Sequence, residues 1–218
     1  MRYLLTLLIT VILYSCGETE EIQKNRMTVT TNSDEAKELF YKALDTHSGL
    51  NWQIARDLLK SALAKDPDFI TAKVLLNSPF VNNTDLKILN NIYNNNLDGI
   101  TEMEAIYIKG WYEVATGEEE DSRETFKTLT TNYPDIPIFW LHSGILKSGG
   151  RGGDIKDAIS DLEKCLEVDP NNYGANAFLM AKHMVVGTLG RMLPVEERDL
   201  NIAIVNEFAK IFNRLDID

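Results

Sequence analysis

The chain has 218 residues, of which 22 are basic and 33 are acidic, so its formal net charge at neutral pH is −11. A surface this acidic repels nucleic acid, so nucleic-acid binding is not expected. Glycine and proline are sparse and lie between apolar stretches, and the alternating runs typical of half-buried strands are hard to find, which predicts an almost entirely helical chain.

Residues 1–15 have the anatomy of a secretory signal peptide. Arg2 precedes an apolar run from Tyr3 to Tyr14, and the polarity changes at Glu18. A spanning helix needs about 20 apolar residues, and this run is shorter. We therefore predict a cleaved leader rather than a permanent transmembrane helix.

The end of this leader, Leu13-Tyr14-Ser15-Cys16, resembles the lipobox of bacterial lipoproteins. The resemblance implies that the thiol of Cys16 is acylated, with palmitate among the acyl groups, and that the chain is cut immediately before it. Several acyl chains on one residue give durable anchoring, which a single chain does not. The alternative is an ordinary secreted protein whose cysteine merely lies near the cut.

Residues 16–33 are polar and have no apolar period, so they are predicted to form a flexible tether. Glu18, Glu20 and Glu21 resemble the acidic export signal of some Bacteroidetes lipoproteins, although they also suit a solvated tether. The expected location is the cell envelope, lipid-anchored, at the outer membrane and facing the periplasm or the exterior. Without residues 1–15 the chain has 21 basic and 33 acidic residues, a formal charge of −12.

Residues 34–218 contain an internal repeat. Pro67, Pro134 and Pro170 each follow a helical pattern. The residues five, eight and twelve positions before each proline form three sets in which small and large side chains alternate in a similar order. The sets are Ala62, Leu59 and Ala55; Leu129, Phe126 and Ser122; and Cys165, Leu162 and Ala158. Steps of three and four place each set on one helical face, and proline ends the helix. Each set therefore predicts the second helix of a two-helix unit.

A frame of 34 residues places the first helix of each unit upstream. Three such frames start at Ala36, Met103 and Pro137, and each has an apolar residue at position 4 and a small residue at position 8. These residues are Leu39 and Ala43 in the first frame, Ile106 and Gly110 in the second, and Trp140 and Gly144 in the third. The third frame contains two inserted residues after position 11. This pattern resembles the tetratricopeptide repeat family. The resemblance implies an all-α, right-handed superhelical solenoid of about four to five helix pairs. Positions 7 and 11 depart from the family pattern, at Lys42, Thr46, Lys109 and Glu113.

The remaining segments fit the same architecture. Residues 70–102 are predicted as a degenerate repeat, with helices near 70–77 and 84–95 and a break at Ser78-Pro79. Residues 173–186 are expected to form the first helix of a fifth unit. After Pro194, an apolar stripe predicts a C-terminal capping helix, with Leu200, Ile204, Phe208, Ile211 and Leu215 on one face.

Catalytic and metal-binding patterns are weak. His47, His142 and His183 lie in three different repeats without the spacing of metal ligands, and the glycine-rich residues 148–154 lack the ending of a P-loop. We therefore expect no enzyme activity, no metal and no cofactor. Cys165 is predicted to be a small buried apolar residue.

The resemblance also implies a binding surface, because the first helices of the family line a concave groove through positions 2, 5, 9 and 12. The candidate partner-binding residues are Phe40, Leu44, Tyr107, Trp111, Leu141 and Ile145. Tyr107 and Trp111 lie one turn apart and suit an anchoring role; alternatively, both rings pack as core. The implied function is a lipid-anchored cell-envelope scaffold for a protein or peptide partner. The alternative is a component of an outer-membrane assembly or glycan-uptake machine.

Overall fold

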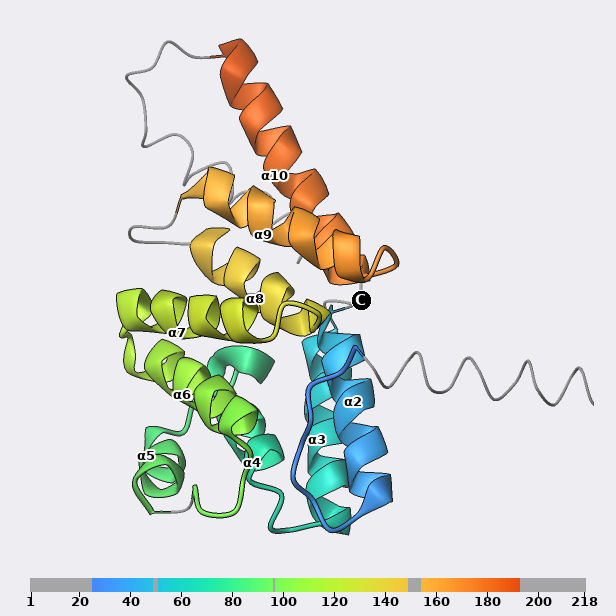
Figure 1. Cartoon of the computed structure of the whole chain (residues 1–218), viewed down its shortest axis with the longest axis vertical. Helices are drawn as coiled ribbons and strands as arrows, with labels where there is room; N and C mark the ends of the chain where they lie inside the picture. The colour runs from blue at the N-terminus through green and yellow to red at the C-terminus, as the bar shows by residue number, and fades with distance from the viewer. Residues whose placement is uncertain (1–24, 49–50, 96, 149–153, 193–218) are drawn as a thin grey trace, which may run out of the picture.

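The computed structural model describes residues 25–48, 51–95, 97–148 and 154–192, with side chains as far as residue 183. Every regular element in these ranges is a helix (Figure 1), which confirms the predicted all-α class. The helices are α2 Asp34–Ser48, α3 Trp52–Lys65, α4 Ile70–Leu76, η1 Pro79–Val81, α5 Leu86–Asn95, α6 Glu102–Thr116, α7 Glu119–Asn132, α8 Pro137–Ser148, α9 Ile155–Val168 and α10 Tyr173–Met192.

Three pairs of consecutive helices pack closely on each other: α2 with α3, α6 with α7, and α8 with α9. In two of the pairs, the helices meet between positions 8 and 24 of the repeat frame. A Cβ added to Gly110 would lie 2.6 Å from Cε2 of Phe126, and one added to Gly144 would lie 2.8 Å from Cγ of Leu162. Small residues at position 8 therefore allow the close approach of the two helices.

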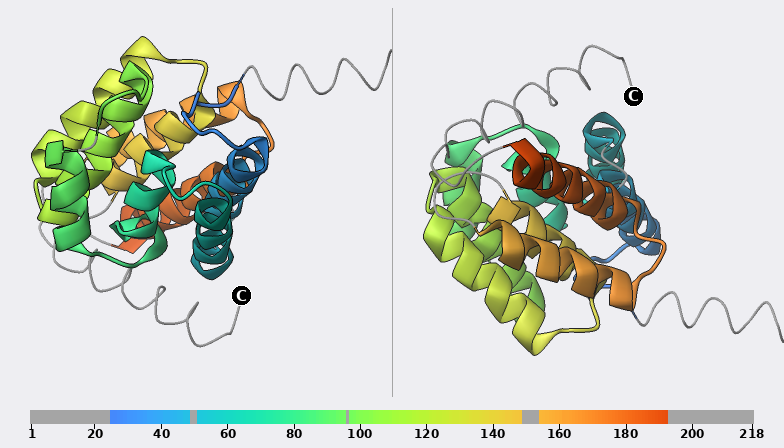
Figure 2. Two further views of the ribbon diagram at one scale, coloured as in Figure 1. Left: turned by 90° about the horizontal axis from the view of Figure 1, so that it is seen from below. Right: turned by 90° about the horizontal axis from the view of Figure 1, so that it is seen from above.

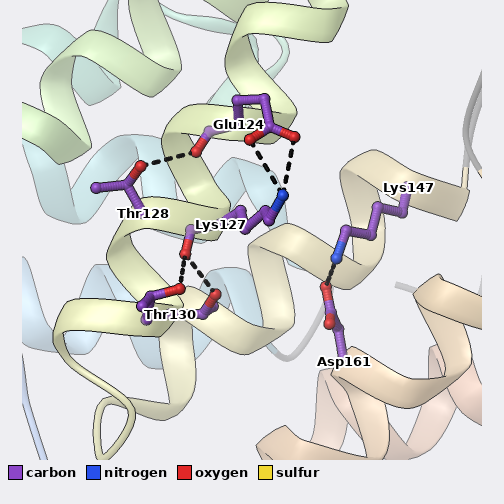
Figure 3. A network of polar contacts seen from close by, with 7 residues as sticks. Glu124, Lys127, Thr128, Thr130, Lys147 and Asp161 are labelled. Carbon is purple, nitrogen blue, oxygen red and sulfur yellow. Dashed lines mark hydrogen bonds and ion pairs between the residues drawn. The ribbon is translucent and has the colours of Figure 1, made fainter.

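Polar networks replace apolar packing at positions 7 and 11, where the sequence departs from the family pattern. In the α6–α7 pair, Lys109 Nζ lies 2.6 Å from Glu113 Oε1, and the Thr125 hydroxyl donates to Glu113 Oε2 at 2.6 Å. In the α8–α9 pair, Lys147 Nζ lies 2.6 Å from Oδ2 of Asp161 (Figure 3).

The second network also includes Ser143, whose hydroxyl donates to Oδ2 of Asp161 at 2.6 Å. Allowing for the two inserted residues, Thr125 and Asp161 both stand at position 23 of their frames. The two pairs thus use the same three positions, 7, 11 and 23, to pair polar groups across the helix contact.

The segment between the first two pairs is helical where predicted but is not a regular pair. Helix α4 has only 7 residues, and α5 packs mainly on α6, where the rings of Tyr93 and Tyr112 stack with centroids 4.2 Å apart. The break at Ser78-Pro79 is confirmed, because Pro79 begins η1 and the Ser78 hydroxyl accepts from the amide of Phe80.

Residues 25–33 form an N-terminal strap that packs on the helices, which corrects the prediction of a flexible tether for this part of 16–33. Arg26 pairs with Asp45 at 2.8 Å, and the Tyr41 hydroxyl donates to the backbone oxygen of Met27, whose side chain is buried. The hydroxyl of Thr31 donates to the Asp66 carboxylate. Residues 1–24, with the predicted leader and Cys16, lie outside the described residues.

The first helix of the described chain contacts the start of the last one. Helix α2 contacts both α8 and α10, and Gly174 at the start of α10 lies so close to the end of α2 that an added Cβ would collide with the backbone oxygen of Ser48. Lys182 on α10 donates to the backbone oxygen of Ser148 on α8 at 3.1 Å. Figure 2 shows the helices arranged around an interior that they share. The glycine-rich residues 149–153 and the predicted cap in 193–218 lie outside the described residues.

Candidate functional site

Aromatic and histidine rings from five elements meet in the interior. We call this group the inner ring cluster; it consists of His47 on α2, Phe80 on η1, Tyr107 and Trp111 on α6, Phe126 on α7 and His142 on α8. All of these side chains are buried. The cluster therefore joins the first helix pair to the two later ones.

His47 makes the contacts that tie α2 to the rest of the cluster. Its ring stacks on Phe80 with centroids 3.8 Å apart and an interplanar angle of 16°. It also meets the ring of His142 edge-on, with centroids 5.3 Å apart, and that of Trp111 at 6.5 Å. A single residue near the end of α2 thus touches η1, α6 and α8.

His142 makes the corresponding contacts from α8. Its Nδ1 atom lies 3.2 Å from the Tyr107 hydroxyl, within hydrogen-bonding distance, and its ring meets Trp111 edge-on with centroids 5.1 Å apart. The Tyr107 contact joins α6 to α8 whichever nitrogen of the imidazole carries the proton.

Three polar atoms of the cluster have no hydrogen-bond partner among the described residues: Nδ1 of His47, Nε1 of Trp111 and Nε2 of His142. More than about 90% of buried polar groups in proteins are paired, and an unpaired one costs about 1–3 kcal/mol. Three in one cluster therefore mark the interior as the most unusual part of the described structure.

The cluster is uncharged at neutral pH. Burial lowers the pKa of His47 to about 4. Burial also holds the pKa of His142 well below its usual range, with a smaller contribution from His47. For Tyr107, burial raises the pKa of the hydroxyl above its ordinary value, so this group stays protonated as well.

The predicted groove residues lie in this interior but do not form an open surface. Tyr107 and Trp111 are members of the cluster, while Phe40, Leu44 and Leu141 are buried in the same core. Ile145 is partly buried against it. Of the two alternatives for Tyr107 and Trp111, the structure has both rings packed as core, because α2 and η1 cover the face of α6; the partner-binding role itself stays a prediction.

The sequence pattern gives His47 and His142 no functional role and makes no prediction for Phe80. A signal for His47 was available, because it stands at position 12 of the first frame, one of the positions that face the groove in the family. For Phe80 and His142 the pattern carries no such signal. Their role depends on how α8 and the irregular η1 meet α2.

A second buried polar group, Glu104, lies outside the cluster. Its side chain is 0% exposed and accepts from the amide of Thr30 at 2.8 Å and from the hydroxyls of Thr30 at 2.6 Å and Thr71 at 2.8 Å. It also forms the capping box of α6 with Thr101. The carboxylate thus joins the strap, α4 and α6, and its oxygens are occupied, which indicates a structural role.

The last features to consider are Cys165, groups that could bind a metal, and helices that could span a membrane. Cys165 is a free, buried cysteine whose pKa is raised by burial to about 12, which confirms its prediction as a buried small residue and makes its thiol unreactive. In the described ranges, no group of three or more His, Cys, Asp or Glu side chains is arranged to hold a metal ion. None of the described helices combines the length and the apolar content that crossing a bilayer requires.

Comparison of the chain with family models, with curated proteins and with solved structures gives no match.

Proposed function

We propose that the protein is a lipid-anchored scaffold of the cell envelope, which binds a protein or peptide partner through a right-handed tetratricopeptide-like helical array. The observation that best supports this proposal is the contact shared by the α6–α7 and α8–α9 pairs, where position 8 meets position 24. Arrays of repeated helix pairs present extended surfaces and have no inherent chemistry, so binding is the function that this architecture favours.

The proposed binding surface is the inner face of α6. Tyr107 and Trp111 are large amphipathic rings of the kind that anchor partners, and Trp111 Nε1 has no hydrogen-bond partner among the described residues. A backbone carbonyl of a peptide would supply the missing acceptor. Because His47 and Phe80 cover these rings, binding requires α2 and η1 to move away from α6.

The anchor restricts where such a partner would be met. The chain is attached to the body from Arg26 onward, ten residues after Cys16. Ten extended residues span at most about 35 Å, so an acylated Cys16 would hold Arg26, and with it the end of α2 at Asp45, within that distance of the membrane surface. The partner is therefore expected to be a membrane-associated protein of the envelope.

Two measurements test the proposal. Mass spectrometry of the mature N-terminus from membranes should find acylated Cys16, and Cys16→Ala should release the protein from the membrane. For the partner, a photoreactive phenylalanine derivative at position 111 should crosslink an envelope protein in cells, whereas the same group at the exposed Lys127 on α7 should not. An unmodified N-terminus would refute the anchor, and identical adducts from both positions would refute the inner face.

No described residue favours the alternative of an outer-membrane assembly or glycan-uptake component, and it stays a prediction.

A further inference from the structure

Helix α2 is attached to the rest of the protein at both ends, by different chemistry. At its start, the strap is held by hydrogen bonds from Thr30 to Glu104 and from Thr31 and Asn32 to Asp66. At its end, His47 is held in the inner ring cluster by ring contacts and by a backbone hydrogen bond with Phe80, and Ser48 lies against Gly174 of α10. The first attachment uses carboxylates and the second uses two neutral imidazoles.

We propose that His47 and His142 form an acid-operated latch, which holds the end of α2 against α6 and α8 and releases it when the imidazoles take up protons. The inference concerns only the contact of α2 with these helices. It therefore does not depend on the lipid anchor or on the identity of a partner.

The surroundings of the latch offer no free carboxylate to a positive charge, and the backbone hydrogen bond with Phe80 offsets only part of the effect of burial on the pKa of His47. Within the cluster, η1 and α7 contribute Phe80 and Phe126, and α6 contributes Trp111 and the protonated Tyr107. The carboxylates of the adjoining elements are engaged elsewhere. Glu104 binds the strap, Glu113 pairs with Lys109, and Asp161 pairs with Lys147.

Two further charged groups on packed elements are cations. Arg56 on α3 donates to the backbone oxygens of Val81 and Asn82 next to η1, and Lys182 on α10 donates to that of Ser148 on α8. A proton on His47 or His142 would thus be buried without a counter-charge, and two protons would repel across ring centroids 5.3 Å apart.

The direction of the pH effect follows from linkage. In the closed structure the pKa of His47 is about 4, and in the open form it would return toward the ordinary value of about 6.5. The open form then binds more protons, so acid favours it. At pH 4.5, His47 alone shifts the balance toward the open form by roughly 80-fold relative to pH 8.

The strap attachment is expected to persist further into acid. The hydrogen bond from Thr31 lowers the pKa of Asp66 below its ordinary value, so this carboxylate stays ionised where the imidazoles are already protonated. The end of α2 would therefore open first and pivot about the strap. This motion uncovers Tyr107 and Trp111.

The test uses Trp111 as the only tryptophan, in the full chain with Trp52→Phe and Trp140→Phe. Between pH 7 and pH 4.5 we expect a red shift of Trp111 emission and at least a fivefold rise in its quenching by acrylamide, with helical circular dichroism retained. His47→Phe combined with His142→Phe should abolish this change. The matched control His183→Phe, at an exposed position of α10, should leave it intact.

Three results would overturn the latch. One is an unchanged acid transition in the double variant, and another is a transition in which circular dichroism is lost together with the Trp111 shift. The third comes from nuclear magnetic resonance of the unsubstituted protein: ordinary titration of both histidines near pH 6.5 while Trp111 stays buried. This last measurement decides the question even if the double variant does not fold.

Discussion

Single residues in this protein carry contacts that join segments far apart in the sequence, and Glu104 is the strongest case. It accepts hydrogen bonds from Thr30, which is 74 residues away, and from Thr71 and Thr101. A hydrogen bond to a charged group contributes about 1.5–3 kcal/mol, and an unsatisfied buried donor is costly to leave. The stability of the strap and of the α4–α6 contact therefore depends on one carboxylate.

We expect Glu104→Gln to lower the free energy of unfolding by about 2–4 kcal/mol, because the amide nitrogen would face donors rather than accept from them. Glu102→Gln is the matched control, since Glu102 is exposed in the first turn of the same helix. Urea unfolding of both variants measures the difference. Equal stability of the two variants would contradict the structural role of Glu104.

A second prediction at this scale concerns Gly110. Alanine there would gain about 1 kcal/mol of helix propensity, but its Cβ would lie 2.6 Å from Cε2 of Phe126, and overpacking costs about 1–3 kcal/mol. We expect Gly110→Ala to be destabilising by up to about 2 kcal/mol, the difference between these two effects. Phe126→Leu should reduce this cost when the two substitutions are combined, and a thermal unfolding cycle over the four proteins would show whether the two sites are coupled.

At the scale of elements, the strap is an addition to the helix pairs that acts through side-chain hydrogen bonds. The Thr31 hydrogen bond lowers the pKa of Asp66, and the amides of Asn32 and Asp68 donate to the same carboxylate. A carboxylate with a lowered pKa stabilises the folded state above its unfolded pKa, and that contribution is lost as pH falls through the folded pKa. The strap is thus tied more firmly at neutral pH than in strong acid.

Thr31→Val should therefore raise the pKa of Asp66 and lower the free energy of unfolding by about 1.5–3 kcal/mol at pH 7, the typical contribution of a hydrogen bond to a charged group. The pKa is measured by nuclear magnetic resonance of the carboxyl carbon. Thr128→Val, which removes an exposed hydroxyl bonded to the backbone oxygen of Glu124, is the control and should leave the pKa of Asp66 unchanged (Figure 3).

The helix pairs could be predicted because their signal is local. Spacings of three and four residues identify the buried face, and the prolines identify where the second helix of a pair ends. The polar residues at positions 7 and 11 could not be assigned in this way. Whether Lys109 and Glu113 face solvent or each other depends on Thr125, which belongs to the opposite helix.

The strap and the inner ring cluster were missed for a related reason. Residues 25–33 have no apolar period, so they resemble a tether, and their partners Glu104 and Asp66 are distant in sequence. His47 and His142 are 95 residues apart and meet only because α2 returns to α8. Contacts between the first helix and the later helices cannot be inferred from the repeat pattern.

At the scale of the whole molecule, this closure distinguishes the protein from an open array. In an open solenoid each repeat contacts only its neighbours, so stability is nearly a sum of local contributions. Here α2 at the beginning contacts α8 and α10 near the end of the described chain. The first and last helices are therefore expected to gain stability from each other.

Gly174→Ala tests this coupling, because a Cβ at that position would collide with the backbone oxygen of Ser48, which cannot rotate away as a side chain can. We expect hydrogen exchange to accelerate at the end of α2 as well as in α10. Gly144→Ala is the control: its Cβ would meet Leu162 within the α8–α9 pair, so faster exchange should stay near those helices. If Gly174→Ala affected α10 alone, α2 would be stable without the closing contact, and the protein would behave as an open array.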